Sequence, residues 1–163
     1  MANNRSSGGT MIIMATFLCS LVLSQIPFPR ILDWARPEWV LMVLIYWVLV
    51  LPHRVGMGTA FLVGIALDLI KGSVLGLNAL SLVIIAYVTY LLHQRMLMYP
   101  LWQQGCLVLV LVGINQLIFH WMQMVVGMTG DNLWFLLPSL VSAALWPWIF
   151  IVLNGIRQLF RIH

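Results

Sequence analysis

No charged residue interrupts the stretch LWQQGCLVLVLVGINQLIFHWMQMVV at residues 101–126, which lies within the uncharged residues 96–130. A transmembrane helix needs about 20 consecutive, predominantly apolar residues to cross the hydrocarbon core of a bilayer. The stretch is long enough, and its apolar residues form continuous runs rather than the alternation of a membrane β-barrel strand. It therefore predicts a membrane-spanning α-helix.

The rest of the chain has the same character. Of its 163 residues, 63% are hydrophobic and 7% are Asp, Glu, Lys or Arg, whereas a soluble domain has about 25% charged residues. So few polar groups cannot cover a globule in water, which excludes a soluble enzyme and a disordered tail. The net charge is +4, but the cations are spread along the chain and form no nucleic-acid footprint. We predict an all-α, polytopic membrane protein embedded in the lipid bilayer.

Charges and turn signals divide the chain into six predicted spans within a single membrane domain, residues 1–163. The first span lacks a small-residue cleavage pattern, so it is interpreted as a retained anchor. The turn signal Pro52-His53-Arg54 separates the second and third spans. Both are short for a full crossing, so a re-entrant pair is the alternative. The predicted spans are roughly residues 10–28, 38–52, 55–70, 75–92, 101–126 and 133–154.

Six spans place both termini on one side of the membrane. With the termini in the cytoplasm, more cations lie inside than outside, which follows the positive-inside tendency. We therefore predict an N-in, C-in bundle whose short loops leave no room for a soluble catalytic or receptor domain. The predicted inside cations are Arg5, Arg54, Arg95, Arg157 and Arg161, and the outside cations are Arg30, Arg36 and Lys71.

Asp68 is a carboxylate within a predicted span. A charge there costs about 2.5–3.5 kcal/mol on insertion scales, so such residues are candidates for function and face protein or water. Lys71 lies three residues further on, on the same helix face. Three interpretations stay open: a structural role as a rim ion pair or as an acceptor from nearby backbone groups, contact with a partner or ligand, and proton or ion handling.

A stripe of small residues runs along the same predicted helix. Its members are Gly56, Ala60, Gly64, Asp68 and Gly72, at steps of four. Small residues at that spacing allow another helix to approach closely. The stripe therefore predicts either helix packing within the protein or a docking face for a partner's helix.

The fifth span carries Gln116, His120 and Gln123 on one helix face. These side chains predict a polar pocket or, alternatively, a set of interhelical hydrogen bonds. One histidine without Cys, Asp or Glu at ligand spacing makes no metal site, and we expect no cofactor. Cys19 and Cys106 lie inside apolar runs and are interpreted as packed thiols.

Known catalytic patterns do not fit this sequence. It has neither a GxSxG elbow nor an HExxH pair. An aspartic dyad needs two intramembrane acids, and paired aspartates that could hold Mg²⁺ are also missing. We expect a protein that is not an enzyme.

One long stretch carries a family resemblance. Arg36-Pro37 followed by WVLMVLIYWVLVLPHRVGMGTAFLVGIALDLIKGSVLGLNAL at residues 39–80 closely resembles the MreD family of rod shape-determining membrane proteins of Gram-negative bacteria. LWQQ at 101–104 and LWPWIF at 145–150 are similar to further stretches of that family. The resemblance covers nearly the whole chain and is densest at residues 36–80.

The resemblance implies an inner-membrane, multi-pass component of the elongasome, which builds lateral peptidoglycan and determines rod shape. It implies association with the bitopic protein MreC, with the MreB filament through MreC, and with RodA glycosyltransferase and its class B penicillin-binding transpeptidase. It also implies a body similar to the substrate-capturing subunits of energy-coupling-factor transporters. We therefore expect a non-catalytic scaffold that docks partner helices. The alternative is a membrane subunit that binds a small molecule or lipid.

Overall fold

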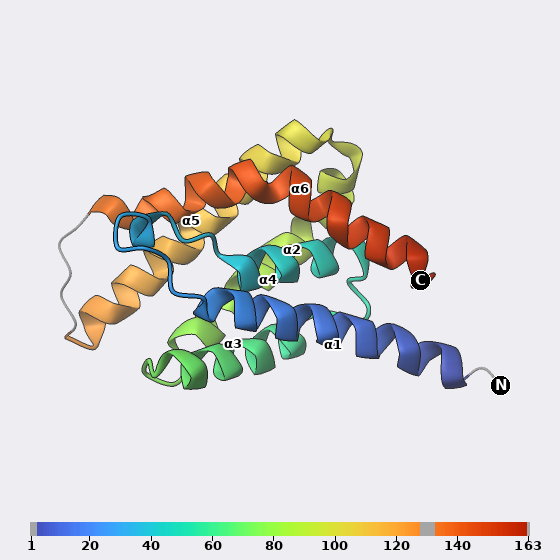
Figure 1. Cartoon of the computed structure of the whole chain (residues 1–163), viewed down its shortest axis with the longest axis horizontal. Helices are drawn as coiled ribbons and strands as arrows, with labels where there is room; N and C mark the ends of the chain where they lie inside the picture. The colour runs from blue at the N-terminus through green and yellow to red at the C-terminus, as the bar shows by residue number, and fades with distance from the viewer. Residues whose placement is uncertain (1–2, 128–132, 163) are drawn as a thin grey trace.

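A computed structural model describes residues 3–127 and 133–162, and these residues form helices joined by turns and loops, with no strand among them (Figure 1). The predicted all-α class is therefore confirmed for the described residues. The elements are α1 (Asn3–Gln25), η1 (Asp33–Ala35), α2 (Trp39–Val50), α3 (Met57–Lys71), α4 (Leu77–Met98), α5 (Leu101–Val125), η2 (Leu133–Leu136) and α6 (Leu137–Leu159).

Four of the described helices are long and apolar enough to cross a membrane: α1 from Ser7 onward, α4, α5 and α6. The other two are shorter, with 12 residues in α2 and 15 in α3. At 1.5 Å per residue they extend about 18 Å and about 22 Å, against a hydrocarbon core of about 30 Å. The chain is thus a multi-pass membrane protein, and the count of six crossings stays a prediction.

Prolines set several helix ends that the sequence interpretation misplaced. α1 ends shortly before Pro27, and α4 continues through the polar residues 93–95 until Pro100 follows it. A residue that precedes proline is forced away from helical backbone angles, whereas polar side chains continue a helix without strain. The sixth span was predicted to begin at residue 133. Residues 133–136 form η2, and α6 begins after them with Pro138 in its first turn.

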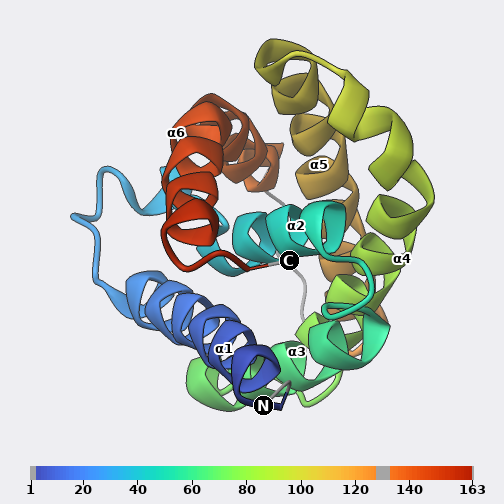
Figure 2. The ribbon, with the colours of Figure 1, turned by 90° about the vertical axis from the view of Figure 1, so that its right-hand side faces the viewer.

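α2 is the central element of the bundle (Figure 2). Every residue from Val40 to Leu49 is buried, and α2 contacts α1, α4, α5 and α6. The Trp47 indole Nε1 donates a hydrogen bond to Thr16 Oγ1 of α1 at 2.9 Å. A helix that is apolar on all sides is suited to a place in a core, and here that core is formed by the protein's other helices.

The remaining helices surround α2 in chain order. α3 packs against α4, α4 against α5, and α5 against α6, and α1 packs chiefly against α2. The described ends of α1 and α6 nearest the two chain termini lie at the same end of the molecule (Figure 1). The opposite end carries the α3–α4 turn and the segment that leads from α1 into α2.

Candidate functional site

The Asp68 carboxylate organises the α3–α4 turn. Its Oδ1 accepts hydrogen bonds from Ser73 Oγ at 2.7 Å, from the Asn78 backbone N–H at 3.1 Å and from Asn78 Nδ2 at 2.7 Å. Its Oδ2 accepts from the backbone N–H groups of Gly76 at 2.9 Å and Ala79 at 3.4 Å. The N–H groups of Gly76, Asn78 and Ala79 lie at the start of α4, where helix N–H donors lack intrahelical partners. Asp68 therefore caps the N-terminus of the following helix.

The backbone around this carboxylate completes the turn. Gly72 has φ of +64°, the left-handed region in which glycine avoids a side-chain penalty. The Ser73 N–H donates to the Asp68 carbonyl at 3.1 Å, which satisfies one of the free carbonyls at the end of α3. Among the described residues the only ion pair joins Arg36 and Asp33, so Lys71 does not pair with Asp68. The contacts of Asp68 fit the structural interpretation of this residue, in which its carboxylate accepts hydrogen bonds from nearby backbone groups.

Most of the small-residue stripe faces the inside of the protein. Ala60, Gly64 and Asp68 are buried. A Cβ built on Gly64 would lie 2.3 Å from the Cα of Ala79 on α4, so only glycine permits this approach. A Cβ on Gly56 would meet nothing within 4 Å. The stripe thus makes contacts within this chain, and its use by a partner helix stays a prediction.

The polar residues of α5 reach different surroundings. Gln116 Nε2 donates to Glu38 Oε1 at 2.7 Å, whereas His120 and Gln123 are half-buried further along the helix. Asn115 is buried, and its Oδ1 has no hydrogen-bond partner. Gln116 therefore bonds to the segment that precedes α2, and both a polar pocket of the three residues and a set of interhelical hydrogen bonds stay predictions.

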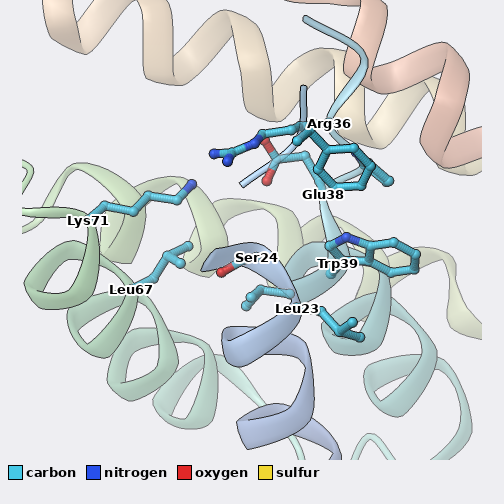
Figure 3. A pocket seen from close by; sticks show the side chains of 10 residues that line it. Leu23, Ser24, Arg36, Glu38, Trp39, Leu67 and Lys71 are labelled. Atoms are coloured by element: carbon cyan, nitrogen blue, oxygen red, sulfur yellow. The ribbon is translucent and has the colours of Figure 1, made fainter. Parts of the chain in front are cut away.

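A small cleft of about 60 Å³ opens at the end of the molecule opposite the termini; we call it the rim cleft (Figure 3). In Figure 3 the Arg36 guanidinium and the Lys71 ammonium point toward one another across it. They come from the segment before α2 and from the end of α3. The lining residues are Leu23, Ser24, Phe28, Arg36, Pro37, Glu38, Trp39, Val40, Leu67 and Lys71.

One ion pair and several hydrogen bonds hold the Arg36–Glu38 segment in place. Arg36 Nε lies 3.0 Å from Asp33 Oδ1, and a terminal guanidinium nitrogen donates to the Ile26 carbonyl at 3.2 Å. The Glu38 backbone N–H donates to Ser142 Oγ on α6 at 3.0 Å. Together with the Glu38–Gln116 hydrogen bond, these contacts link the segment to α5 and α6.

A second, apolar concavity of about 420 Å³ lies between α1 and α6 over α2; we call it the lateral groove. α1 supplies small side chains to one wall, and α6 supplies larger ones to the other. Leu23 and Trp39 line both this groove and the rim cleft. The full lining comprises Ile12, Ala15, Thr16, Cys19, Ser20, Leu23, Trp39, Val43, Trp148, Ile149, Val152, Leu153, Ile156 and Phe160.

The expectation of packed thiols is wrong. Cys19 and Cys106 are both exposed free cysteines. α1 is covered mainly by α2, so a residue on its outer face stays open although its sequence neighbours are apolar. Cys19 lines the lateral groove, whereas Cys106 lies on α5 and does not.

The rim charges that the topology prediction placed inside lie away from this site. Arg95 is exposed in the last turn of α4. The Arg54 guanidinium packs on α1, where a Cβ on Gly9 would lie 2.6 Å from its terminal nitrogen. Ile162, near the C-terminus, is buried beside the same glycine. The α2–α3 turn therefore meets both terminal segments at one end of the molecule.

The sequence interpretation missed four polar residues of this region: Glu38, Ser73, Asn78 and Ser142. The Lys71-Gly72-Ser73 helix stop carried a signal for Ser73 and Asn78, because they follow Asp68 closely. Glu38 and Ser142 are far apart in the sequence, so no sequence signal pointed to their contact. Among the described residues, no three His, Cys, Asp or Glu side chains group as a metal site requires.

These features define a class: a small, all-helical multi-pass membrane protein with a central buried helix and a polar rim. Comparison with known proteins then identifies the family. The chain belongs to the MreD family of rod shape-determining proteins, whose model matches residues 4–156. The rod shape-determining protein MreD of Haemophilus influenzae is 33% identical over 154 residues, which cover 93% of each chain. No solved structure matches the chain significantly.

Family membership confirms the resemblance found in residues 36–80 and assigns the chain to rod shape determination. The family is a shape-determining component and not a known enzyme.

Proposed function

We propose that this chain is a non-catalytic scaffold of the bacterial inner membrane that assembles or regulates the cell-elongation machinery through helix docking. Its proposed direct partner is the bitopic protein MreC, which links it to the MreB filament. The proposed further partners are RodA glycosyltransferase and its class B penicillin-binding transpeptidase. Family membership supports this role.

The lateral groove is the observation that carries the proposal. Its α1 wall contains Ala15, Thr16, Cys19 and Ser20, and small residues of this kind let a second helix approach closely in a membrane. Its α6 wall offers larger apolar side chains such as Trp148. A single membrane-spanning helix fits such a surface, because its association depends on close packing rather than on a hydrophobic driving force.

The stripe on α3 is a weaker docking face. Gly64 is already covered by α4 of the same chain, so a partner's helix cannot reach it without separating α3 from α4. We therefore assign the docking helix to the lateral groove.

The two native cysteines provide a matched test. A Cys106→Ser variant leaves Cys19 in the groove, and a Cys19→Ser variant leaves Cys106 on α5. Each single-cysteine protein is labelled with a benzophenone maleimide in membranes that contain MreC and is then irradiated. We expect a covalent adduct with MreC from position 19 and little or none from position 106.

A mild-detergent pull-down of the same tagged proteins separates two kinds of failure. Recovery of MreC with cross-links from position 106 only would refute the groove and keep the scaffold. Recovery of a transporter ATPase pair in place of MreC would refute the scaffold and favour the alternative of a capture subunit.

A further inference from the structure

We propose that the rim cleft binds the phosphodiester headgroup of an anionic membrane lipid, such as phosphatidylglycerol. The proposal rests on the juxtaposition of Arg36 and Lys71 and goes beyond the docking of a partner helix. Neither cation serves the α3–α4 turn, which Asp68 organises with other donors.

The cations outnumber the carboxylates among the residues that line the cleft. Arg36 and Lys71 are cationic and Glu38 is anionic, whereas Asp33 pairs with Arg36 from outside the lining. Lys71 has no carboxylate partner among the described residues. Asp33 lies beside Arg36 Nε, and one terminal guanidinium nitrogen donates to the Ile26 carbonyl at 3.2 Å, which leaves the other terminal nitrogen to reach into the cleft (Figure 3).

The geometry suits a phosphate group. A guanidinium offers donors in a planar fork, and an ammonium adds a compact charge with rotatable donors. Both point into the cleft from opposite sides (Figure 3). The Ser24 hydroxyl also lines the cleft but donates to the Leu21 carbonyl at 2.7 Å. Glu38 Oε1 is engaged by Gln116 at 2.7 Å, so part of its carboxylate is already occupied by a hydrogen bond.

The surroundings favour a lipid over a free anion. The cleft has apolar walls from Leu23 and Leu67, and Leu69 and Ile70 beside it on α3 are exposed. It meets the apolar lateral groove at Leu23 and Trp39. A lipid satisfies both parts of the site, with its phosphate between the cations and its chains along the apolar surface.

Native mass spectrometry of the delipidated full chain tests the proposal. The protein is titrated with dioleoylphosphatidylglycerol, dioleoylphosphatidylcholine or inorganic phosphate, and the bound fraction is measured. We expect one tightly held phosphatidylglycerol, with weaker phosphatidylcholine because its choline cation is repelled. Removal of each cation by Arg36→Gln or Lys71→Gln should weaken phosphatidylglycerol binding about fivefold.

Matched variants guard against loss of folding. Lys71→Arg keeps the charge and should keep the lipid, and Arg95→Gln removes an exposed cation at the other end of the molecule and should change nothing. Glu38→Gln keeps an acceptor for Gln116 and should strengthen binding. The proposal is overturned by equal binding to wild type and Lys71→Gln, by equal binding of the two lipids, or by displacement of the lipid with millimolar inorganic phosphate.

Discussion

At the scale of single residues, the position of Asp68 gives a carboxylate within a membrane segment a structural role. Burial of such a charge is tolerated when donors surround it, and Asp68 accepts from two side chains and three backbone N–H groups at the start of α4. The positive end of the α4 dipole adds a favourable interaction with the negative charge. The free-energy cost of burying the Asp68 charge in the membrane is thus offset by its capping interactions with the N-terminus of α4.

Replacing Asp68 tests the capping role directly. Asp68→Ala leaves these donors without an acceptor, and we expect the free energy of unfolding to fall by about 2–4 kcal/mol, since one hydrogen bond to a charged group contributes about 1.5–3 kcal/mol. Asp68→Asn should lose less, because it keeps one acceptor oxygen. Thermal or SDS-induced unfolding in mixed micelles, followed by circular dichroism, measures both.

Lys71→Gln is the control that separates a cap from an ion pair. A cap predicts that this variant unfolds like the wild type, because Lys71 does not pair with Asp68. If Lys71→Gln were as unstable as Asp68→Ala, the stabilisation would come from the two opposite charges and the capping interpretation would fail.

At the scale of elements, α4 is held at both ends by polar side chains of its neighbours. Asp68 caps its start, and Gln104 of α5 donates from Nε2 to the carbonyls of Met96 at 2.9 Å and Tyr99 at 3.1 Å at its end. Helix ends leave four donors and four acceptors unsatisfied, and few waters are available for them inside a bilayer. The two adjacent helices therefore supply the groups that water supplies in a soluble protein.

The close approach of α3 and α4 gives a second prediction. Gly64→Ala places a methyl group against the Ala79 backbone, which cannot move as a side chain can. We expect a loss of about 1–3 kcal/mol, the usual range for overpacking, and a drop in the unfolding temperature in detergent.

Gly113→Ala is the matched control, because a Cβ on Gly113 of α5 meets nothing within 4 Å. Alanine is the better helix former, so this variant should unfold at the same temperature as the wild type or slightly higher. Equal destabilisation by both substitutions would contradict a specific contact between Gly64 and Ala79.

At the scale of the whole molecule, the fold class could be read from the sequence, whereas the position of α2 could not. Continuous apolar runs such as residues 101–126 identify membrane helices. An apolar helix that faces lipid and one that faces other helices have the same composition, so the burial of residues 40–49 left no mark in the sequence. Arg36 was likewise predicted only as a topology charge, and Lys71 as a topology charge or a partner of Asp68, because the meeting of Arg36 and Lys71 depends on how α1, α2 and α3 pack.

The two ends of the bundle show which positions would report the predicted orientation in the membrane. Arg54 of the α2–α3 turn packs on α1 at Gly9 beside Ile162, so this turn shares an end with both termini. The α3–α4 turn, with the exposed Val74, lies at the opposite end. An N-in, C-in orientation therefore predicts that position 53 faces the cytoplasm and position 74 the periplasm.

Cysteine accessibility measures this orientation. In a Cys19→Ser, Cys106→Ser background, His53→Cys or Val74→Cys is exposed to a membrane-impermeant maleimide in spheroplasts and in inverted vesicles. We expect position 74 to react in spheroplasts and position 53 in inverted vesicles only. Reaction of both positions from one side would show that α3 does not cross and that α2 and α3 form a re-entrant pair. A re-entrant pair returns the chain to the side on which it entered, so Arg36 and Lys71 would stay on the same side of the membrane in either case.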